Sequence, residues 1–166
     1  MPALRQPMHL ILVTFGSVFL LPGQYKPANS QFSTRFRLEV RLAHERVAAD
    51  EPVEISTTLK NISRAPATFA ETMDEWDYDF IVTDMSGHAP PRTAYGQRLA
   101  RAERGGRRIG RTLDPDAEVH RKFDLRSIFV FARGRYCLRA LRFVSSEDGK
   151  TPSVALSNAA CFEVTK

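Results

Sequence analysis

The sequence predicts an all-β protein, a β-sandwich of about seven short strands. Apolar and polar residues alternate in several short runs, and glycine, proline and aspartate residues that favour turns separate these runs. No segment of helical length has a convincing 3.6-residue apolar period. The chain has 166 residues, of which 43% are hydrophobic, enough for one domain with a sizeable core. Several short strands separated by turns are typical of a sandwich.

The expected strands follow one another from Phe36 to Val164. Alternation is clearest in Phe36–Leu42 and Val53–Lys60, where apolar residues occupy every second position. Further strands are expected at 68–72, 78–83, 119–125, 134–144 and 160–164. Residues 86–114 contain Pro90 and Pro91 and have no good apolar period, so we predict a long extended loop with, at most, a short strand around Gly96–Leu99. A loop of this length in a compact domain is usually functional or mobile.

The first thirty residues differ from the rest of the chain. Arg5 is the only charged residue before an uncharged apolar run from Met8 to Leu21, which Pro22 and Gly23 end. This layout is typical of a secretory signal peptide, and the run is shorter than the about 20 residues that span a bilayer. The alternatives are an uncleaved anchor or a buried N-terminal element. We therefore expect a signal peptide and leader at 1–30, a domain at 31–166 without a membrane span, and a periplasmic or secreted location.

The two cysteines are predicted to form a disulfide. If Tyr136 and Leu138 face the core, Cys137 faces outward, and the alternation of the last strand turns Cys161 outward as well. Their midpoint is Gly149, in an Asp-Gly turn, so a hairpin centred there places them directly opposite each other. Facing residues of this kind lie about 4.5 Å apart at Cα, near the short end of disulfide geometry. The alternative is two free thiols.

The order of these motifs resembles that of bacterial immunoglobulin-like domains of the intracellular proteinase inhibitor type (BsuPI type). The matching stretches are 53–63, 113–118, 134–136 and 157–158, which together span most of residues 36–164. The resemblance implies an immunoglobulin-like β-sandwich with Tyr136 as its corner tyrosine. It also implies, by analogy of fold alone, a proteinase inhibitor that acts through a sandwich loop. The expected signal peptide and the arginine-rich loop depart from the pattern of that intracellular inhibitor.

The strongest local anomaly is residues 98–111, which contain six arginines and one glutamate. Guanidinium groups suit carboxylate, phosphate or sulfate, so we expect this segment to bind a protein or an anionic component of the cell envelope. The alternative is a solvated, mobile loop. Nucleic acid is not expected, because the formal charge is only +5 and aromatic residues do not interleave the arginines. The candidate contact residues are Arg98, Arg101, Arg104, Arg107, Arg108 and Arg111, together with the single tryptophan, Trp76.

Residues 71–79 place five carboxylates around Trp76. Their spacing does not match a calcium-binding loop, so we expect no metal here but a surface turn whose acids pair with the arginine-rich segment. Catalytic motifs are missing: His44, His88 and His120 stand alone, and there is no Gly-x-Ser-x-Gly, phosphate loop or Cys-x-x-Cys. The expectation is a binding module without a cofactor, not an enzyme. A small hydrolase, whose catalytic groups would meet only in space, is a third hypothesis.

Overall fold

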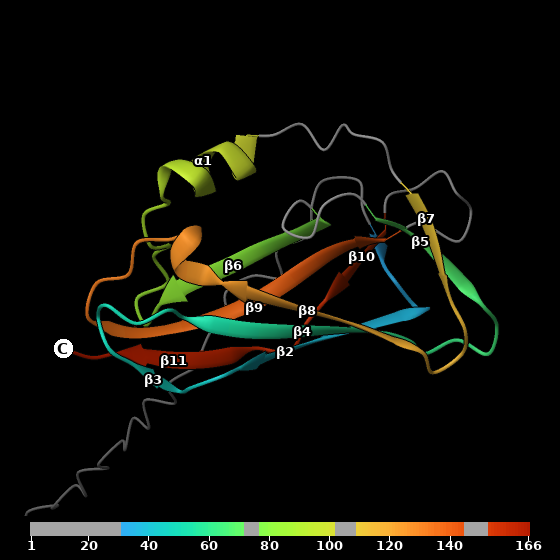
Figure 1. Ribbon diagram of the computed structural model, residues 1–166, viewed down its shortest axis with the longest axis horizontal. Coiled ribbons are helices and arrows are strands. Elements are labelled where there is room, and N and C mark those ends of the chain that lie inside the picture. The colour runs from blue at the N-terminus through green and yellow to red at the C-terminus, as the bar shows by residue number, and fades with distance from the viewer. Residues whose placement is uncertain (1–30, 72–76, 102–108, 145–152) are drawn as a thin grey trace, which may run out of the picture.

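The computed structural model describes residues 31–71, 77–101, 109–144 and 153–166 (Figure 1). The described residues form mainly antiparallel β-strands and one short α-helix, α1 (Ala94–Arg101). The predicted all-β class is therefore confirmed. No helix among the described residues is long and apolar enough to cross a membrane. The predicted signal peptide, 1–30, lies outside the described residues.

The largest sheet is built around its longest strand, β9, which is flanked on both sides by antiparallel strands. One neighbour is β6, and the other side of β9 is occupied in turn by β10 and β11. Two short strands extend the sheet in parallel, β1 beside β10 and β3 beside β11. The strands of this sheet are β1 (Gln31–Phe32), β3 (Arg46–Val47), β6 (Tyr78–Asp84), β9 (Gly134–Val144), β10 (Ser153–Leu156) and β11 (Ala160–Val164).

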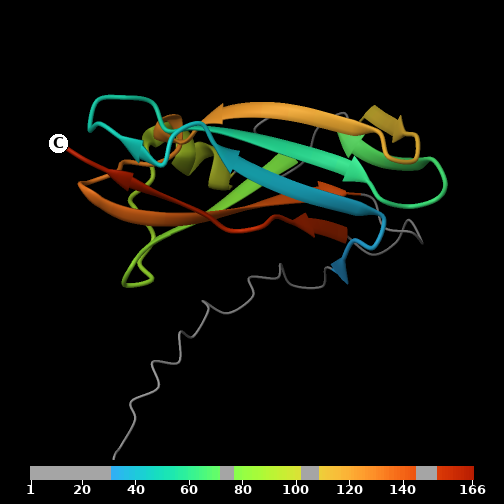
Figure 2. The same cartoon turned by 90° about the horizontal axis from the view of Figure 1, so that it is seen from below.

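The second layer is an antiparallel sheet of three strands, β2 (Phe36–Leu42), β4 (Glu54–Asn61) and β8 (Glu118–Asp124), with β4 in the middle. Figure 2 shows this sheet and the β9 sheet as two layers. Apolar residues at every second position face the space between them. Phe123 of β8, for example, packs edge-on against Tyr78 and Phe80 of β6, with ring centroids 4.9 and 5.1 Å apart. The alternation read from the sequence thus gives the buried face of each strand.

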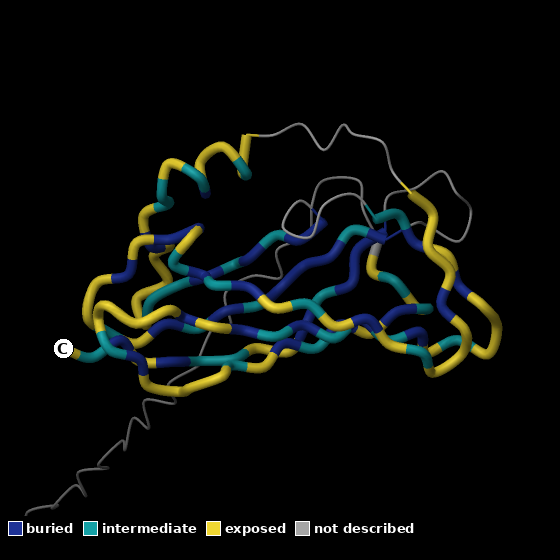
Figure 3. The backbone as a smooth tube through the Cα atoms, in the orientation of Figure 1, coloured by how far each residue is buried: buried dark blue, intermediate teal, exposed yellow. Residues whose placement is uncertain are grey.

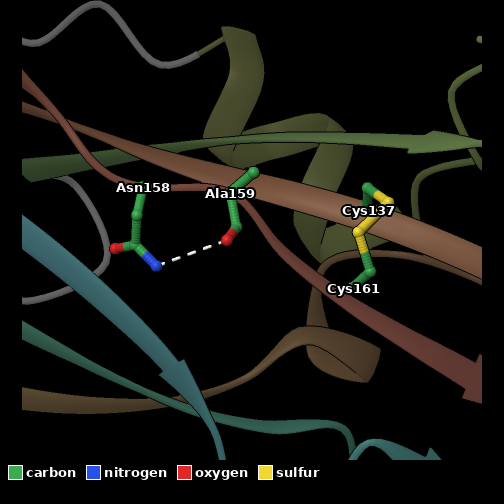
Figure 4. The surroundings of a disulfide bond; sticks show 4 residues. All are labelled: Cys137, Asn158, Ala159 and Cys161. Atoms are coloured by element: carbon green, nitrogen blue, oxygen red, sulfur yellow. Dashed lines mark hydrogen bonds between the residues drawn. A yellow bond between two sulfur atoms is a disulfide. The ribbon is translucent and has the colours of Figure 1, made fainter.

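The predicted disulfide is present. Cys137 of β9 lies directly opposite Cys161 of β11, with their Cα atoms 4.0 Å apart (Figure 4). The returning strand is interrupted, however: Leu156 pairs with Leu141 but Ala160 pairs with Leu138, so one extra residue lies between β10 and β11. This is the geometry of a β-bulge, which the sequence pattern did not predict.

The bulge contains Asn158, which links the two layers. Its side-chain oxygen accepts the backbone N–H of Val40 at 2.9 Å, and its amide nitrogen donates to the Val40 carbonyl at 3.0 Å. The Asn158 side chain therefore makes, at Val40 alone, the pair of hydrogen bonds that a residue of a neighbouring strand would make there. At the other end of β9, the hydroxyl of Tyr136 donates to the carbonyl of Ala132 at 3.1 Å.

The prediction of one extended loop over 86–114 is wrong for its described residues. A helix, α1, replaces the short strand considered at 96–99, and strand β7 (Ile109–Leu113) pairs with β5 (Ala67–Glu71) in a separate two-stranded ribbon. The helix begins at Thr93, whose hydroxyl accepts the N–H of Gly96 at 2.9 Å, a typical N-cap. Tyr95 and Leu99, one turn apart, pack against the core. Two apolar positions are too few to stand out as a helical period in the sequence.

Candidate functional site

The structure places three of the predicted contact arginines. Arg98 and Arg101 lie on α1, and Arg111 lies on β7. Arg104, Arg107, Arg108 and Trp76 lie outside the described residues. We call Arg98, Arg101 and Arg111 the candidate contact arginines.

Arg98 and Arg101 are exposed and are three residues apart, so they lie at neighbouring positions on the helix surface. The guanidinium group of Arg98 lies 5.8 Å from the ring centroid of Tyr95. The helix itself contains no acidic residue. It therefore presents two positive charges to solvent without an intrahelical counter-charge.

Close packing positions this helix on the body of the protein. Gly96 is buried, and a Cβ atom at this position would lie 2.0 Å from the carbonyl oxygen of Ile128. The N–H of Thr93 donates to the same carbonyl at 2.9 Å, and the Thr93 hydroxyl donates to the carbonyl of Ser127 at 2.6 Å. The start of α1 is thus held against the loop that follows β8.

Replacing Gly96 with alanine is expected to displace α1, because the added methyl group would overlap a backbone atom that cannot rotate away. Overpacking of this kind typically lowers the free energy of unfolding by about 1–3 kcal/mol. Urea denaturation followed by circular dichroism measures the effect. Gln97→Ala, an exposed change on the same helix, is the control and should change stability by less than about 0.5 kcal/mol. Equal stability of the two variants would contradict the tight helix contact.

The turn that leads from β6 toward α1 is fixed by a carboxylate. Asp84 accepts the backbone N–H groups of Ser86 and His88 at 2.8 and 2.9 Å. The N–H of His88 is the main cause of a lowered pKa for Asp84, partial desolvation opposes it, and the N–H of Ser86 adds to it. Farther along, the guanidinium group of Arg92 lies 3.7 Å from the Asp79 carboxylate. The segment between β6 and α1 is thus held at its start by Asp84 and near its end by Arg92.

The β5–β7 ribbon carries Arg111, the third candidate contact arginine. Its two strands are joined by a regular antiparallel register and by a hydrogen bond of 2.8 Å between the hydroxyls of Thr68 and Thr112. Phe69 of β5 is fully buried, whereas residues 109–112 of β7 are all exposed. The exposed colour along most of the β7 ribbon can be followed in Figure 3. The ribbon is therefore fixed to the body through β5 and through Leu113 at the end of β7, and the rest of β7 faces solvent.

Glu71, the last residue of β5, is the ionic anchor of this ribbon. Its Oε1 accepts from Arg121 of β8 at 2.7 Å, and its Oε2 accepts from Arg111 of β7 at 3.4 Å. The predicted pairing of the acidic segment with the arginine-rich segment is thus confirmed for Glu71 and Arg111. The predicted surface position is wrong for Asp77, which is buried. Asp74 and Glu75 lie outside the described residues.

Arg142 of β9 was missed by the sequence reasoning. Its side chain is completely buried, with Oε1 of Glu71 at 3.8 Å and Oδ2 of Asp77 at 3.6 Å from Nη2. Its guanidinium carbon lies 4.8 Å from the ring centroid of Phe69 and 4.7 Å from that of Tyr78. The sequence did contain a signal. Extending the inward alternation of β9 by two residues from Ala140 reaches Arg142, a charged residue at a core position.

The charged residues of this region do not gather into a metal site. Within the described ranges, no three histidine, cysteine, aspartate or glutamate side chains lie close enough together to hold a metal ion. Glu71 is instead surrounded by three arginines, and Asp77 faces Arg142. The arrangement is one of ion pairs between arginines and carboxylates.

No family model matches the chain, and no curated protein matches its sequence. Several solved structures are similar in part, including the three that follow. The alkylpurine DNA glycosylase AlkC of Pseudomonas fluorescens, bound to DNA with an abasic site analogue, has 16% identity and a TM-score of 0.40; the match covers 80% of this chain and only 31% of the glycosylase. A target of the Northeast Structural Genomics Consortium has 12% identity and a TM-score of 0.40, with 80% of this chain and 89% of the target covered. The putative ApaA protein of Bordetella pertussis has 10% identity and a TM-score of 0.41, with 82% and 98% covered. Similarities of this size assign neither a family nor an activity.

Proposed function

We propose that this protein is an exported, non-catalytic binding module of the cell envelope that uses its arginine-rich segment to bind an anionic partner. The observation that carries the proposal is the exposure of Arg98 and Arg101 on a helix that contains no acid and is packed tightly against the body. A fixed pair of guanidinium groups favours carboxylate, phosphate or sulfate. The partner is a protein or an anionic envelope component with such groups on its surface.

The proposed scaffold is an immunoglobulin-like sandwich. In such a domain the strands called A, B and E share one sheet, and C, F and G share the other. Here β2, β4 and β8 lie in one sheet, and β6, β9 and β11 lie in the other. The hydrogen bond from Tyr136 to Ala132, four residues upstream at the start of β9, has the form of the tyrosine corner of these domains. Both features support the resemblance to bacterial immunoglobulin-like domains.

Export is proposed from two independent features. The apolar run at 8–21 follows a short start with one arginine and ends at Pro22, as in secretory signal peptides. The disulfide between Cys137 and Cys161 suits an oxidising compartment, because such bonds are rare where glutathione and thioredoxin keep thiols reduced. A periplasmic or secreted location fits both.

Neutralising the two helix arginines tests the binding role. Arg98→Gln with Arg101→Gln is expected to weaken binding to the envelope partner, captured from envelope extract, about tenfold, at about 0.7 kcal/mol for each lost exposed contact. The affinity of the unchanged protein should fall as salt is raised. Adding Arg104→Gln, Arg107→Gln and Arg108→Gln should weaken it further.

The matched control is Arg133→Gln with Arg135→Gln, which removes the same charge from exposed positions in the loop before β9 and at its start. This control should bind as the unchanged protein does. If the helix pair and the control pair behave alike, net charge alone explains binding and the proposed surface is wrong.

A further inference from the structure

The outer edge of β7 is free of any described strand. β7 pairs only with β5 among the described strands, and no backbone hydrogen bond from its residues 109–112 to another described element adds to that pairing. These four residues are exposed, and Ile109 is 66% exposed. An exposed edge of this kind is a template on which a further strand can form.

The ribbon would gain stability from a third strand. Two strands alone are marginally stable in water, and three strands with an apolar contact are the usual minimum. In this ribbon β5 is buried against the body through Ala67 and Phe69, whereas β7 is buried only at its last residue, Leu113. The exposed part of β7, residues 109–112, is held by its pairing with β5 and by the contact of Arg111 with Glu71.

The side chains of β7 define what such a strand would carry. Ile109 and Arg111 are two residues apart and therefore lie on the same face of the ribbon. A residue opposite Ile109 would be favourable if apolar, and one opposite Arg111 if acidic, because facing side chains in a sheet interact directly. β7 contains no acidic residue of its own.

Arg111 can turn to an added carboxylate without leaving Glu71 unpaired. The Arg111–Glu71 contact is 3.4 Å long, whereas Arg121 donates to the other oxygen of Glu71 at 2.7 Å. Arg142 lies 3.8 Å from that same oxygen. Glu71 would keep these two cations, and the side chain of Arg111 is already 44% exposed.

We propose that β7 binds an extended segment of a partner protein by strand addition, with an acidic residue opposite Arg111 and an apolar residue opposite Ile109. This rests on the proposed function, since it names the partner class and the binding mode of the same arginine-rich segment. A second copy of this chain fits less well, because pairing two β7 strands brings two Arg111 side chains to the same ribbon.

Amide hydrogen exchange, measured by NMR on the protein as isolated from expressing cells, tests the proposal. The probe is an acetylated octapeptide in which threonine alternates with valine and glutamate, and its match is the same peptide with lysine in place of glutamate. The glutamate peptide should shift the amide signals of residues 109–113 and slow exchange in β7 at least tenfold. The lysine peptide should do neither. A glutamate peptide that leaves β7 exchange unchanged overturns the proposal.

Two variants keep the test specific. Arg111→Glu should abolish the β7 shifts, and Arg133→Glu, the same change at the exposed loop before β9, should preserve them. Because Arg111→Glu also places a second carboxylate near Glu71, Arg111→Gln provides a change that removes the positive charge without adding a negative one, and Glu71 keeps its contacts with Arg121 and Arg142. If both variants keep the tenfold protection, the contacts are elsewhere and the proposal is wrong. Protection of β7 in the free protein that disappears on dilution would show self-pairing and also overturn it.

Heparin, a polyanion that cannot form a strand, separates this proposal from the proposed function. Binding of heparin that needs Arg98 and Arg101, together with no effect of the glutamate peptide on β7, would reject strand addition and retain an anion-binding surface. Protection of β7 by the peptide, together with heparin binding that is unchanged in the Arg98→Gln, Arg101→Gln variant, would retain strand addition and reject the helix as the anion-binding surface.

Discussion

Replacing Arg142 with alanine is expected to lower the free energy of unfolding by about 3–5 kcal/mol, the usual loss when one partner of a buried ion pair is removed. The side chain is completely buried, with carboxylate oxygens of Glu71 and Asp77 at 3.8 and 3.6 Å. Alanine would remove a cation that lies next to the buried carboxylate of Asp77. It would also leave a cavity between the rings of Phe69 and Tyr78, which the guanidinium group now separates.

The measurement is urea denaturation at neutral pH, with Arg139→Ala as the control. Arg139 lies on the same strand but on its opposite, half-buried face, so its loss should change stability by at most about 0.5–1 kcal/mol. Arg142→Met keeps most of the volume and removes the charge, and should fall between the two. If Arg142→Ala is no less stable than Arg139→Ala, the buried cluster does not stabilise the fold.

A double-mutant cycle separates charge from packing. In the Arg142→Met background, Asp77→Asn should be less harmful than in the unchanged protein, because the carboxylate has already lost its cation. A coupling energy of about 1–3 kcal/mol is expected for groups in direct contact. Additive effects would show that Arg142 acts through packing on Phe69 and Tyr78 alone.

The sequence predicted those strands in which one face is buried and the other is not. Phe36–Leu42 and the strand after Val53 appear in the structure almost as expected, because their alternation records burial directly. The register of Cys137 with Cys161 was also predictable, since it needed only the alternation and the position of a turn. The short strands β1 and β3 were not predictable, because two residues give no period.

The candidate site was predictable in composition but not in geometry. The cluster of arginines is visible in the sequence, yet its segment holds a helix because of Thr93 as a cap and a tertiary fit of Gly96 against Ile128. The pairing of β7 with β5 joins residues about 40 positions apart and leaves no local pattern in the exposed strand. The buried ion-pair cluster around Arg142 was predictable, because an arginine on the inward face of a predicted strand needs a buried counter-charge.

Removing the disulfide by replacing Cys137 and Cys161 with alanine is expected to lower the free energy of unfolding by about 3–4 kcal/mol. The bond closes a loop with a sequence separation of 24, and the chain-entropy relation for such a loop gives this value. Urea denaturation of the variant and of the unchanged protein, with and without reductant, measures it. The unchanged protein in reductant should match the variant. Reductant-insensitive stability of the unchanged protein would contradict a structural role for the bond.

The disulfide and the buried arginine should act independently. Cys137 and Arg142 lie five residues apart on β9 and face opposite sides of its sheet, since Cys137 shares the outer face and Arg142 the core face. Among the described residues they share no partner: Cys137 bonds Cys161, and Arg142 contacts Glu71, Asp77, Phe69 and Tyr78. The combined variant should therefore lose the sum of the two single effects within about 0.5 kcal/mol. A total loss of about 6–9 kcal/mol would exhaust much of the roughly 5–15 kcal/mol of stability typical of a domain, so the combined variant is expected to be unfolded or nearly so at 37 °C.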